Sequence, residues 1–305
     1  MTVLVVGSVA LDSVETPFGK ADNVLGGSGT FFSASASHMS PVQLVGVVGN
    51  DYPMDTLKSA FSSRPVDMAG LERADGSSFR WRGRYRHDLN SAETLETHLG
   101  VFSNFTPKIP EKFRKAPFVF LGNIDPRLQL QVLTQVEKPK LVACDTMNFW
   151  IESRRPDLLE LLQHVDLITL NDAEARQLTE EFNLVKAARW IMARGPKLVL
   201  IKKGEHGAFM FTPSSVFFAP AYPLESVFDP TGAGDSFAGG FMGYLARAGD
   251  LSESALRRAV VHGSAMGSFA VEKFSVERLI EITPADIRQR VAEFYSLTSF
   301  ERDAE

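Results

Sequence analysis

The chain has 305 residues, of which 44% are hydrophobic, and its formal net charge is -5. The length is within reach of one large α/β domain carrying an insertion, and the apolar content is ordinary for a globular protein. The acidic balance argues against nucleic acid as a main partner, because that binding depends on clustered positive charge.

The sequence carries no membrane or disulfide signal. No apolar run approaches the roughly 18 residues of a membrane span, and residues 1–7 are typical of a first strand rather than a basic leader. The single cysteine, Cys144, cannot form an internal disulfide, and its apolar surroundings favour buried packing over a reactive thiol. We expect a soluble, cytoplasmic protein that binds neither nucleic acid nor membrane.

Short β-rich runs alternate with helical patterns along the chain. Predicted strands cover 3–7, 43–48, 118–122, 141–145, 167–170 and 198–202, and predicted helices cover 29–39, 126–136, 184–194, 234–248 and 253–274. The alternation predicts an α/β fold with a largely parallel sheet and helices on both faces. Ligands of such sheets bind beyond the carboxyl ends of the strands.

Polar and glycine residues follow the first predicted strand. Asp12 lies just beyond that strand's carboxyl end, where it could accept hydrogen bonds from the hydroxyl groups of a ligand or act as a turn carboxylate. Gly26, Gly27 and Ser28 precede the helix that begins near Gly29. They could let a hydroxylated substrate approach backbone amides, or form an ordinary entry into a helix.

Residues 79–86 alternate strictly between aromatic or small residues and arginines, which predicts a strand with two different faces. A turn near 88–90 would pair this strand with 92–101 and set Arg82 opposite Glu96. The arginine face is either a clamp for a phosphorylated substrate or a solvated face partly balanced by Glu96. The aromatic face, which includes Tyr85, either contacts substrate or a partner subunit or packs on the sheet.

Two later strands also end in polar residues. Asn171 and Glu174 begin a helix, where Glu174 could hold Mg²⁺ through water. The same pair also fits a capping box, with Asn171 as N-cap, and the two uses can coexist. Lys203 and Gly204 end another strand in a turn that could lie against a nucleotide, with a solvated lysine as the alternative.

The most informative segment is Asp229–Ser236, a glycine-rich turn leading into an apolar helical pattern. Gly232, Ala233 and Gly234 let the backbone approach an anion closely, and the helix dipole adds positive potential at the same place. Asp235 in the first turn could take the proton of an attacking hydroxyl, worth roughly 10²- to 10⁴-fold in rate. The alternative is a tight turn with Asp235 as a capping residue.

Asp229–Asp235 resembles the C-terminal signature Asp-Thr-x-Gly-Ala-Gly-Asp of the ribokinase / phosphofructokinase-B carbohydrate kinase family. The resemblance extends from residue 3 to about 275. Four more elements are similar, namely the early substrate-binding aspartate (Asp12), the N-terminal glycine pair (Gly26–Gly29), the Asn-x-x-Glu element (Asn171–Glu174) and the Lys-Gly-x-x-Gly nucleotide turn (Lys203–Gly207). The resemblance implies one ribokinase-like domain over 1–305, with a small β-sheet lid formed by about 12–25 and 77–102.

The resemblance also implies the roles of the site residues. Asp235 would be the catalytic base of an ATP- and Mg²⁺-dependent kinase, and the backbone of 232–235 would be its anion hole. Glu174 would help place the metal, Asn171, Lys203, Gly204, Thr231, Gly232 and Gly234 would bind the nucleotide, and Asp12, Gly26, Gly27 and Ser28 would bind substrate. Asp229 and Thr231 resemble positions that hold a monovalent cation in some relatives.

The acceptor is left open by one departure from the family. Phe31 stands where the family commonly has an asparagine, so recognition of sugar hydroxyls is altered. We expect a primary hydroxyl of a small sugar as acceptor, with a nucleoside kinase as the alternative because aromatic side chains such as Phe31 can stack on a base. A binding protein that lost turnover is a minor alternative, and a homodimer through the lid is a further hypothesis.

Overall fold

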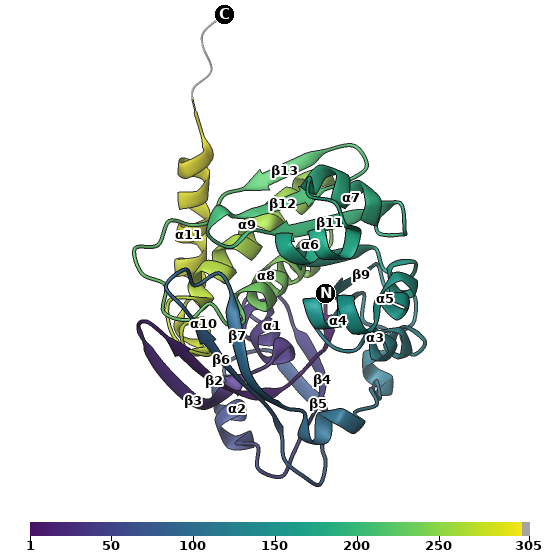
Figure 1. Cartoon of the computed structure of the whole chain (residues 1–305), viewed down its shortest axis with the longest axis vertical. Coiled ribbons are helices and arrows are strands. Elements are labelled where there is room, and N and C mark those ends of the chain that lie inside the picture. Colours follow the sequence, from purple (N-terminus) through teal and green to yellow (C-terminus); the bar gives the residue numbers. More distant parts are fainter. Residues whose placement is uncertain (301–305) are drawn as a thin grey trace, which may run out of the picture.

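The structure is a computed structural model that describes residues 1–300 of the chain. It contains a large twisted sheet with helices on both faces and a separate small sheet at one side (Figure 1). In the described residues the large sheet has nine strands in the order β13 (Val216–Ala219), β12 (Ala208–Phe211), β11 (Leu198–Lys202), β10 (Leu167–Asn171), β9 (Leu141–Asp145), β8 (Phe118–Leu121), β1 (Val3–Val6), β4 (Val42–Val48) and β5 (Val66–Arg73).

The strands from β11 to β5 all run parallel, and β12 and β13 add antiparallel strands at one edge. The six predicted strands are confirmed, each within one residue at either end. They form strands because short apolar runs rich in β-branched residues suit a sheet that has helices on both faces. The side chains of Val3 and Val5 lie in one core cluster and those of Leu4 and Val6 in the other, as the two-residue period of a strand requires.

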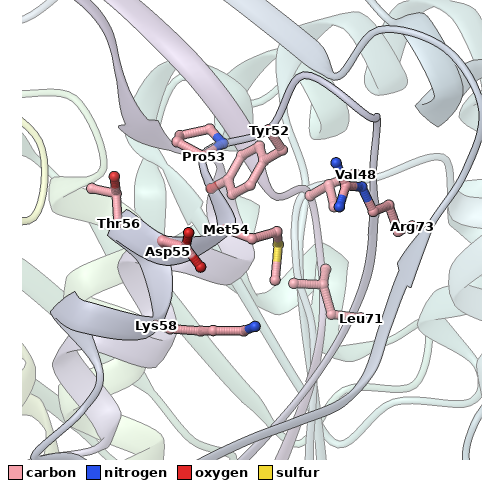
Figure 2. Close-up of a pocket in the computed structure, with 9 residues that line it drawn as sticks. All are labelled: Val48, Tyr52, Pro53, Met54, Asp55, Thr56, Lys58, Leu71 and Arg73. Carbon is pink, nitrogen blue, oxygen red and sulfur yellow. The ribbon is translucent and has the colours of Figure 1, made fainter.

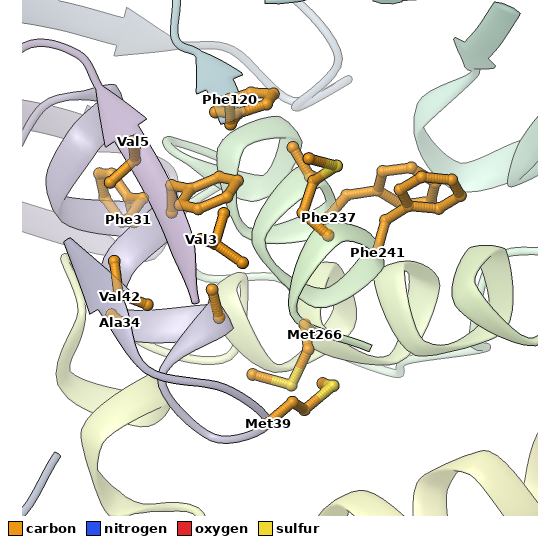
Figure 3. Packing of buried hydrophobic residues seen from close by; sticks show 14 of the residues in the cluster. Val3, Val5, Phe31, Ala34, Met39, Val42, Phe120, Phe237, Phe241 and Met266 are labelled. Atoms are coloured by element: carbon orange, nitrogen blue, oxygen red, sulfur yellow. The ribbon is translucent and has the colours of Figure 1, made fainter. Parts of the chain in front are cut away.

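One layer of helices consists of α1 (Ser28–Ala36), α8 (Ala233–Ala248) and α9 (Glu253–Ala270). Figure 3 shows how Phe31 of α1, Phe237 and Phe241 of α8 and Met266 of α9 surround the side chains of β1 and β8. The other helices are α2 (Met54–Ala60), α3 (Pro126–Leu133), α4 (Asn148–Ser153), α5 (Arg155–Leu162), α6 (Asp172–Thr179), α7 (Leu184–Met192), α10 (Glu277–Glu281) and α11 (Pro284–Thr298). No helix within residues 1–300 combines the length and apolarity needed to cross a bilayer.

The small sheet is the predicted lid. Its order is β3 (Gly19–Gly26), β2 (Ala10–Thr16), β6 (Phe79–Tyr85) and β7 (Ala92–His98), with antiparallel outer pairs joined by the parallel pair β2–β6. Arg82 pairs with Glu96 in register, as predicted. Each arginine of β6 and the next residue, Arg86, faces a carboxylate: Arg80 with Asp51, Arg82 with Glu96, Arg84 with Glu15 and Arg86 with Glu93. The arginine face is therefore balanced within the chain.

Candidate active site

The glycine-rich loop opens α8, and one glycine makes the turn possible. Gly232 is the N-cap, and its φ of 73° lies in the left-handed region that favours glycine. α8 begins at Ala233, one residue earlier than predicted, so Asp235 is the third residue of the helix. Asp229 braces the loop, because its Oδ1 accepts from the Thr231 amide at 2.9 Å and its Oδ2 from the Ser275 amide at 3.4 Å.

The loop amides are not all free to bind an anion. The first amides of a helix lack an intrahelical acceptor and are available to ligands. The Ala233 amide donates to the Pro230 carbonyl at 3.2 Å, however, and is used within the loop. The Ser236 amide donates to the Gly232 carbonyl at 2.8 Å. The anion hole that the sequence predicts over 232–235 therefore depends most on the amides of Gly232, Gly234 and Asp235.

Asp235 lies in a group of charges from three neighbouring strand ends. Burial and the neighbouring Asp145 carboxylate raise the pKa of Asp235 to about 7, against the opposing ammonium of Lys202. Asp145 ends β9 and Lys202 ends β11, and the two side chains form an ion pair of 3.4 Å. Glu174, at the start of α6, contributes further negative charge. A carboxyl group with a pKa near neutrality suits general base catalysis.

Glu174 does take part in a capping box. The Glu174 amide donates to Asn171 Oδ1 at 2.8 Å, and the Asn171 amide donates to Glu174 Oε2 at 2.7 Å. Burial raises the pKa of Glu174 to about 7, although Lys202 opposes the shift. The cap uses one carboxylate oxygen, so the structure accommodates both of the uses that the sequence allows.

The residues present suit Mg²⁺ that arrives with a nucleotide. Asp145 and Glu174 supply two carboxylates that act on one another's charge. Among residues 1–300, no three His, Cys, Asp or Glu side chains gather closely enough to hold a metal by themselves. Mg²⁺ is commonly held by one or two carboxylates together with substrate phosphates and water, so these two carboxylates fit.

The predicted acceptor residues lie next to the loop. The Asp12 carboxylate lies directly over Gly26, where an added Cβ would be 2.1 Å from its Cγ, and it accepts a hydrogen bond from the Gly27 amide at 3.4 Å. Burial raises the pKa of Asp12 to about 7, and the charges of Asp229 and Asp235 contribute to the shift. The Asp12 and Asp235 carboxylates are therefore within electrostatic reach of one another.

Two of the predicted substrate residues have structural partners instead of an open face. The Ser28 amide donates to Ser8 Oγ at 3.0 Å, and Ser28 Oγ accepts from the Ser8 amide at 3.1 Å. Phe31 is 1% exposed, and its ring packs on Gly232, where an added Cβ would be 2.2 Å away. Phe31 thus packs against the glycine-rich loop 229–236, which we call the anion loop because of its predicted role. Its contact with substrate stays a prediction.

The buried Asp12 carboxyl group should make the fold less stable as pH rises from 3.8 to about 7. Its folded pKa of about 7 lies above the reference value of 3.8, so the folded state holds an extra proton between these values and stability falls as pH rises through this window. One pKa unit corresponds to about 1.4 kcal/mol, which makes about 4 kcal/mol the upper limit of the cost.

Asp12→Asn should therefore raise the free energy of unfolding by about 1 kcal/mol or more at pH 8, and by less at pH 5. Denaturant unfolding at both pH values checks this. Asp22→Asn, an exposed position of the same sheet, is the control. An equal gain in the free energy of unfolding at both pH values would show that the ionised Asp12 carboxylate does not destabilise the fold.

The predicted nucleotide turn is closed by a backbone hydrogen bond, and the lid touches it. The Lys203 amide donates to the Gly207 carbonyl at 2.7 Å, and Gly204 has a φ of +52°. Asn90, in the β6–β7 turn, lies over Gly204, with its Oδ1 2.6 Å from the place of an added Cβ, and its Nδ2 donates to Glu205 at 3.5 Å. The tip of the lid therefore reaches from the acceptor side to the predicted nucleotide side.

The aromatic face of β6 contacts three different places in the chain. Phe79 stacks on Phe102 with a 5.5 Å centroid separation, and Trp81 covers Gly83 of its own strand. Tyr85, the last residue of β6, accepts a hydrogen bond from Thr231 Oγ1 at 3.3 Å. Burial raises the pKa of Tyr85, and the charges of Asp229, Asp12 and Asp235 add to the shift. Tyr85 is thus the lid residue that reaches the catalytic loop.

A pocket of about 530 Å³ lies away from these residues, between α2 and the strands β4 and β5 (Figure 2). Its lining includes Val48, Leu71 and Arg73, and none of the predicted site residues. Tyr52 connects this pocket with the candidate site. It lines the pocket, and burial together with the charge of Asp12 raises the pKa of its hydroxyl group. The charged residues around Asp235, and not the residues of this pocket, therefore form the candidate active site.

Sequence reasoning missed Asp145, Lys202 and Tyr85 as site residues. Asp145 and Lys202 are charged residues that end buried parallel strands, and this position alone could have indicated them. The Lys-Gly-x-x-Gly pattern points to the neighbouring Lys203 instead. Tyr85 was noted only as part of an aromatic face, because its contact with Thr231 joins residues 146 positions apart.

Comparison with known proteins agrees with this geometry. Residues 3–282 match the pfkB family carbohydrate kinase profile. The chain is 31% identical to a cytidine kinase of Thermococcus kodakarensis over 83% of this chain and 91% of that protein. It is 25% identical to a ribokinase of Haemophilus influenzae over 96% and 98% of the two chains.

A solved structure shares the fold. An Escherichia coli protein assigned as ribokinase II, in complex with ATP and Mg²⁺, superposes with a TM-score of 0.80 over 96% of this chain and 99% of that one, at 16% identity. Together with the profile match over most of the chain, these findings establish that this protein belongs to the pfkB family of carbohydrate kinases.

Proposed function

We propose that this kinase transfers the γ-phosphoryl group of ATP to a primary hydroxyl of a ribose-type sugar, either free or within a nucleoside. The observation that carries the proposal is the position of Asp235. Its carboxyl group lies in the first turn of α8, beside the anion loop, and its charge acts on the buried Asp12 carboxylate. A proton acceptor, an anion site and a hydroxyl-binding carboxylate therefore converge on one place.

The residues divide the chemistry between them. Asp235 accepts the hydroxyl proton as the acceptor oxygen attacks the phosphorus atom. The loop amides stabilise the negative charge on the transferring group, each worth roughly 10²- to 10³-fold. Asp145 and Glu174 are the residues that would hold Mg²⁺, which when bound neutralises charge on the phosphate oxygens. The lid, through Tyr85, would exclude water from the donor.

A nucleoside acceptor is favoured by the 31% identity to a cytidine kinase over most of both chains. A free sugar is the second candidate, because the match to a ribokinase covers nearly the whole of both proteins. Phe31 does not help to choose, since its ring is buried against Gly232. The choice depends on turnover.

A substrate panel tests the proposal. The purified chain is given ATP and Mg²⁺ with cytidine, other nucleosides, ribose or fructose, and ADP release is measured. Turnover with nucleosides and not with free sugars would assign a nucleoside kinase, and the reverse would assign a sugar kinase. Thermal stabilisation by these ligands without any ADP release would reject the kinase and favour a binding protein.

Tyr85→Phe should raise the acceptor KM about two- to tenfold with little change in kcat. The reason is the loss of one partly buried hydrogen bond to Thr231, worth about 0.5–1.5 kcal/mol, which helps to hold the lid over the acceptor. Steady-state kinetics with varied acceptor measure this. Tyr295→Phe, on the exposed face of α11, is the control. An unchanged acceptor KM would separate Tyr85 from acceptor binding.

Homodimerisation through the lid stays a prediction. The aromatic face that suggested it is in contact with Phe102, Gly83 and Thr231 of the same chain, which weakens the argument. A monovalent cation near Asp229 and Thr231 also stays a prediction. The Asp229 carboxylate already accepts two backbone hydrogen bonds there.

A further inference from the structure

A lysine that the family motifs do not include lies against the anion loop. Lys202 is the last residue of β11, and its side chain is 17% exposed. An added Cβ on Gly234 would lie 2.9 Å from its Nζ, so the ammonium group occupies the space that a side chain at Gly234 would need. Lys203, the next residue, belongs to the nucleotide turn and not to this group.

The charges of three carboxylates act on this ammonium. Asp145 Oδ2 is 3.4 Å from Lys202 Nζ, and the charges of Glu174 and Asp235 also act on it. The ion pair with Asp145 keeps the ammonium group of Lys202 beside the proposed metal ligands, and its charge also acts on the proposed base.

The ion pair to Asp145 is loose. A charge-assisted N–O contact is typically about 2.7–2.9 Å, and this one is 3.4 Å. A flexible lysine stem can turn its ammonium by small rotations. The Asp145 carboxylate thus holds the Lys202 ammonium near Gly234 by a weak contact, and the ammonium group can still bind a second anion.

Within residues 1–300, Lys202 is the cation whose charge acts on both Asp235 and Glu174. Loop amides and the helix dipole supply only partial charges, and Asp145, Glu174 and Asp235 would repel a polyphosphate. A full positive charge at Gly234 lies where negative charge develops on the transferring group. Removing such a preorganised interaction commonly lowers kcat far more than it changes the binding of substrate.

We propose that Lys202 contacts the γ-phosphoryl group of ATP and is a catalytic residue of the transfer, an inference that rests on the proposed kinase function. In the step, the acceptor oxygen bonds to the γ-phosphorus while the bond from that phosphorus to the β,γ-bridging oxygen breaks. The hydroxyl proton passes to Asp235, and ADP leaves. Lys202 exchanges Asp145 for a γ-phosphoryl oxygen and keeps its own proton.

The test uses Lys202→Met and the double variant Asp145→Asn/Lys202→Met. The single variant leaves the Asp145 carboxylate buried without its partner, so it can fail for structural reasons. The double variant removes that unpaired charge. Because Asp145 is also a proposed Mg²⁺ ligand, the double variant is compared with Asp145→Asn alone. If Lys202 only neutralises Asp145, these two variants should have the same thermal stability and the same kcat. If Lys202 contacts the phosphoryl group, their stability should be equal and kcat of the double variant should be roughly 10²- to 10³-fold below that of Asp145→Asn.

Nucleotide binding provides a readout that does not depend on turnover. With Mg²⁺ present, the double variant should bind ATP about tenfold more weakly than Asp145→Asn alone, because a contact to a charged group is lost. Binding of ADP, which lacks the γ-phosphoryl group, should be unchanged. Lys197→Met, at the exposed other end of β11, is the control and should leave both affinities unchanged.

The outcomes separate the two proposals. A kcat of the double variant equal to that of Asp145→Asn, or equal weakening of ATP and ADP binding, would overturn the role of Lys202 and leave the kinase function standing. If the wild type phosphorylates no member of the substrate panel, the proposed function fails. The ATP and ADP affinities then still decide whether Lys202 contacts a γ-phosphoryl group.

Discussion

Asp235→Asn should abolish phosphoryl transfer while ATP still binds. The variant keeps the size of the side chain in the first turn of α8 but cannot take the hydroxyl proton. A general base contributes roughly 10²- to 10⁴-fold, so we expect kcat to fall by at least about 10²-fold. ATP affinity should stay equal or increase, because a carboxylate near the phosphates is removed.

Steady-state turnover and calorimetric titration with ATP measure the two effects. Asp157→Asn, a carboxylate in the first turn of α5, is the matched control and should behave as wild type. Near-normal kcat in Asp235→Asn would show that another group accepts the proton. Loss of ATP binding together with turnover would assign Asp235 to the binding site instead.

The same residue sets the direction of the pH dependence. Burial and Asp145 raise the pKa of Asp235 to about 7, so the carboxyl group is protonated and inactive below this pH. The kcat/KM for the acceptor should therefore rise as pH increases through about 7. The profile reports the group as a whole, because Asp235, Asp145, Glu174 and Lys202 act on each other's charge.

Gly232→Ala should damage both stability and turnover. Its φ of +73° costs a side-chain-bearing residue roughly 1–2 kcal/mol, and the new methyl group would lie 2.2 Å from the Phe31 ring. Displacing a packed ring typically costs a further 1–3 kcal/mol or so. The loop must shift to relieve the contact, and a displacement of about 1 Å can reduce the rate roughly 10²-fold.

Two further variants separate the ring contact from the backbone strain. Gly249→Ala has a nearly equal φ of +68°, and its new methyl would meet only the end of the Met1 side chain at 3.1 Å. It should lose about 1 kcal/mol of stability and keep full turnover. Adding Phe31→Leu to Gly232→Ala should restore part of both properties. If Gly232→Ala and Gly249→Ala behave alike, Phe31 does not support the loop.

Much of this architecture follows from local sequence physics. The six predicted strands are short, apolar and rich in β-branched residues, and such runs between helical patterns indicate a sheet that is covered by helices on both faces. The loop before α8 was also predictable, because glycines and a first-turn aspartate specify a helix entrance that attracts anions. The predicted helix over 253–274 ends earlier, at Ala270, since residues 271–276 turn to bring Ser275 to Asp229.

The rest of the site depends on contacts between distant parts of the chain. The strands β5, β12 and β13 were not predicted. β5 is partly exposed and mixes charged with apolar residues, and β12 and β13 are apolar runs of only 4 residues each. Lys202 meets Gly234, and Tyr85 meets Thr231, only after the sheet has assembled and the lid has docked. Neither contact leaves a local pattern, so the sequence indicated the loop but not all of the residues around it.

The most direct test of the central claim is a crystal structure of the chain with Mg²⁺, a non-hydrolysable ATP analogue and the acceptor identified by the panel. We expect the acceptor hydroxyl at about 3 Å from the Asp235 carboxylate, with the γ-phosphoryl group on the amides of Gly232, Gly234 and Asp235. A complex in which the hydroxyl is held by other groups, with the Asp235 carboxylate facing neither ligand, would contradict the account.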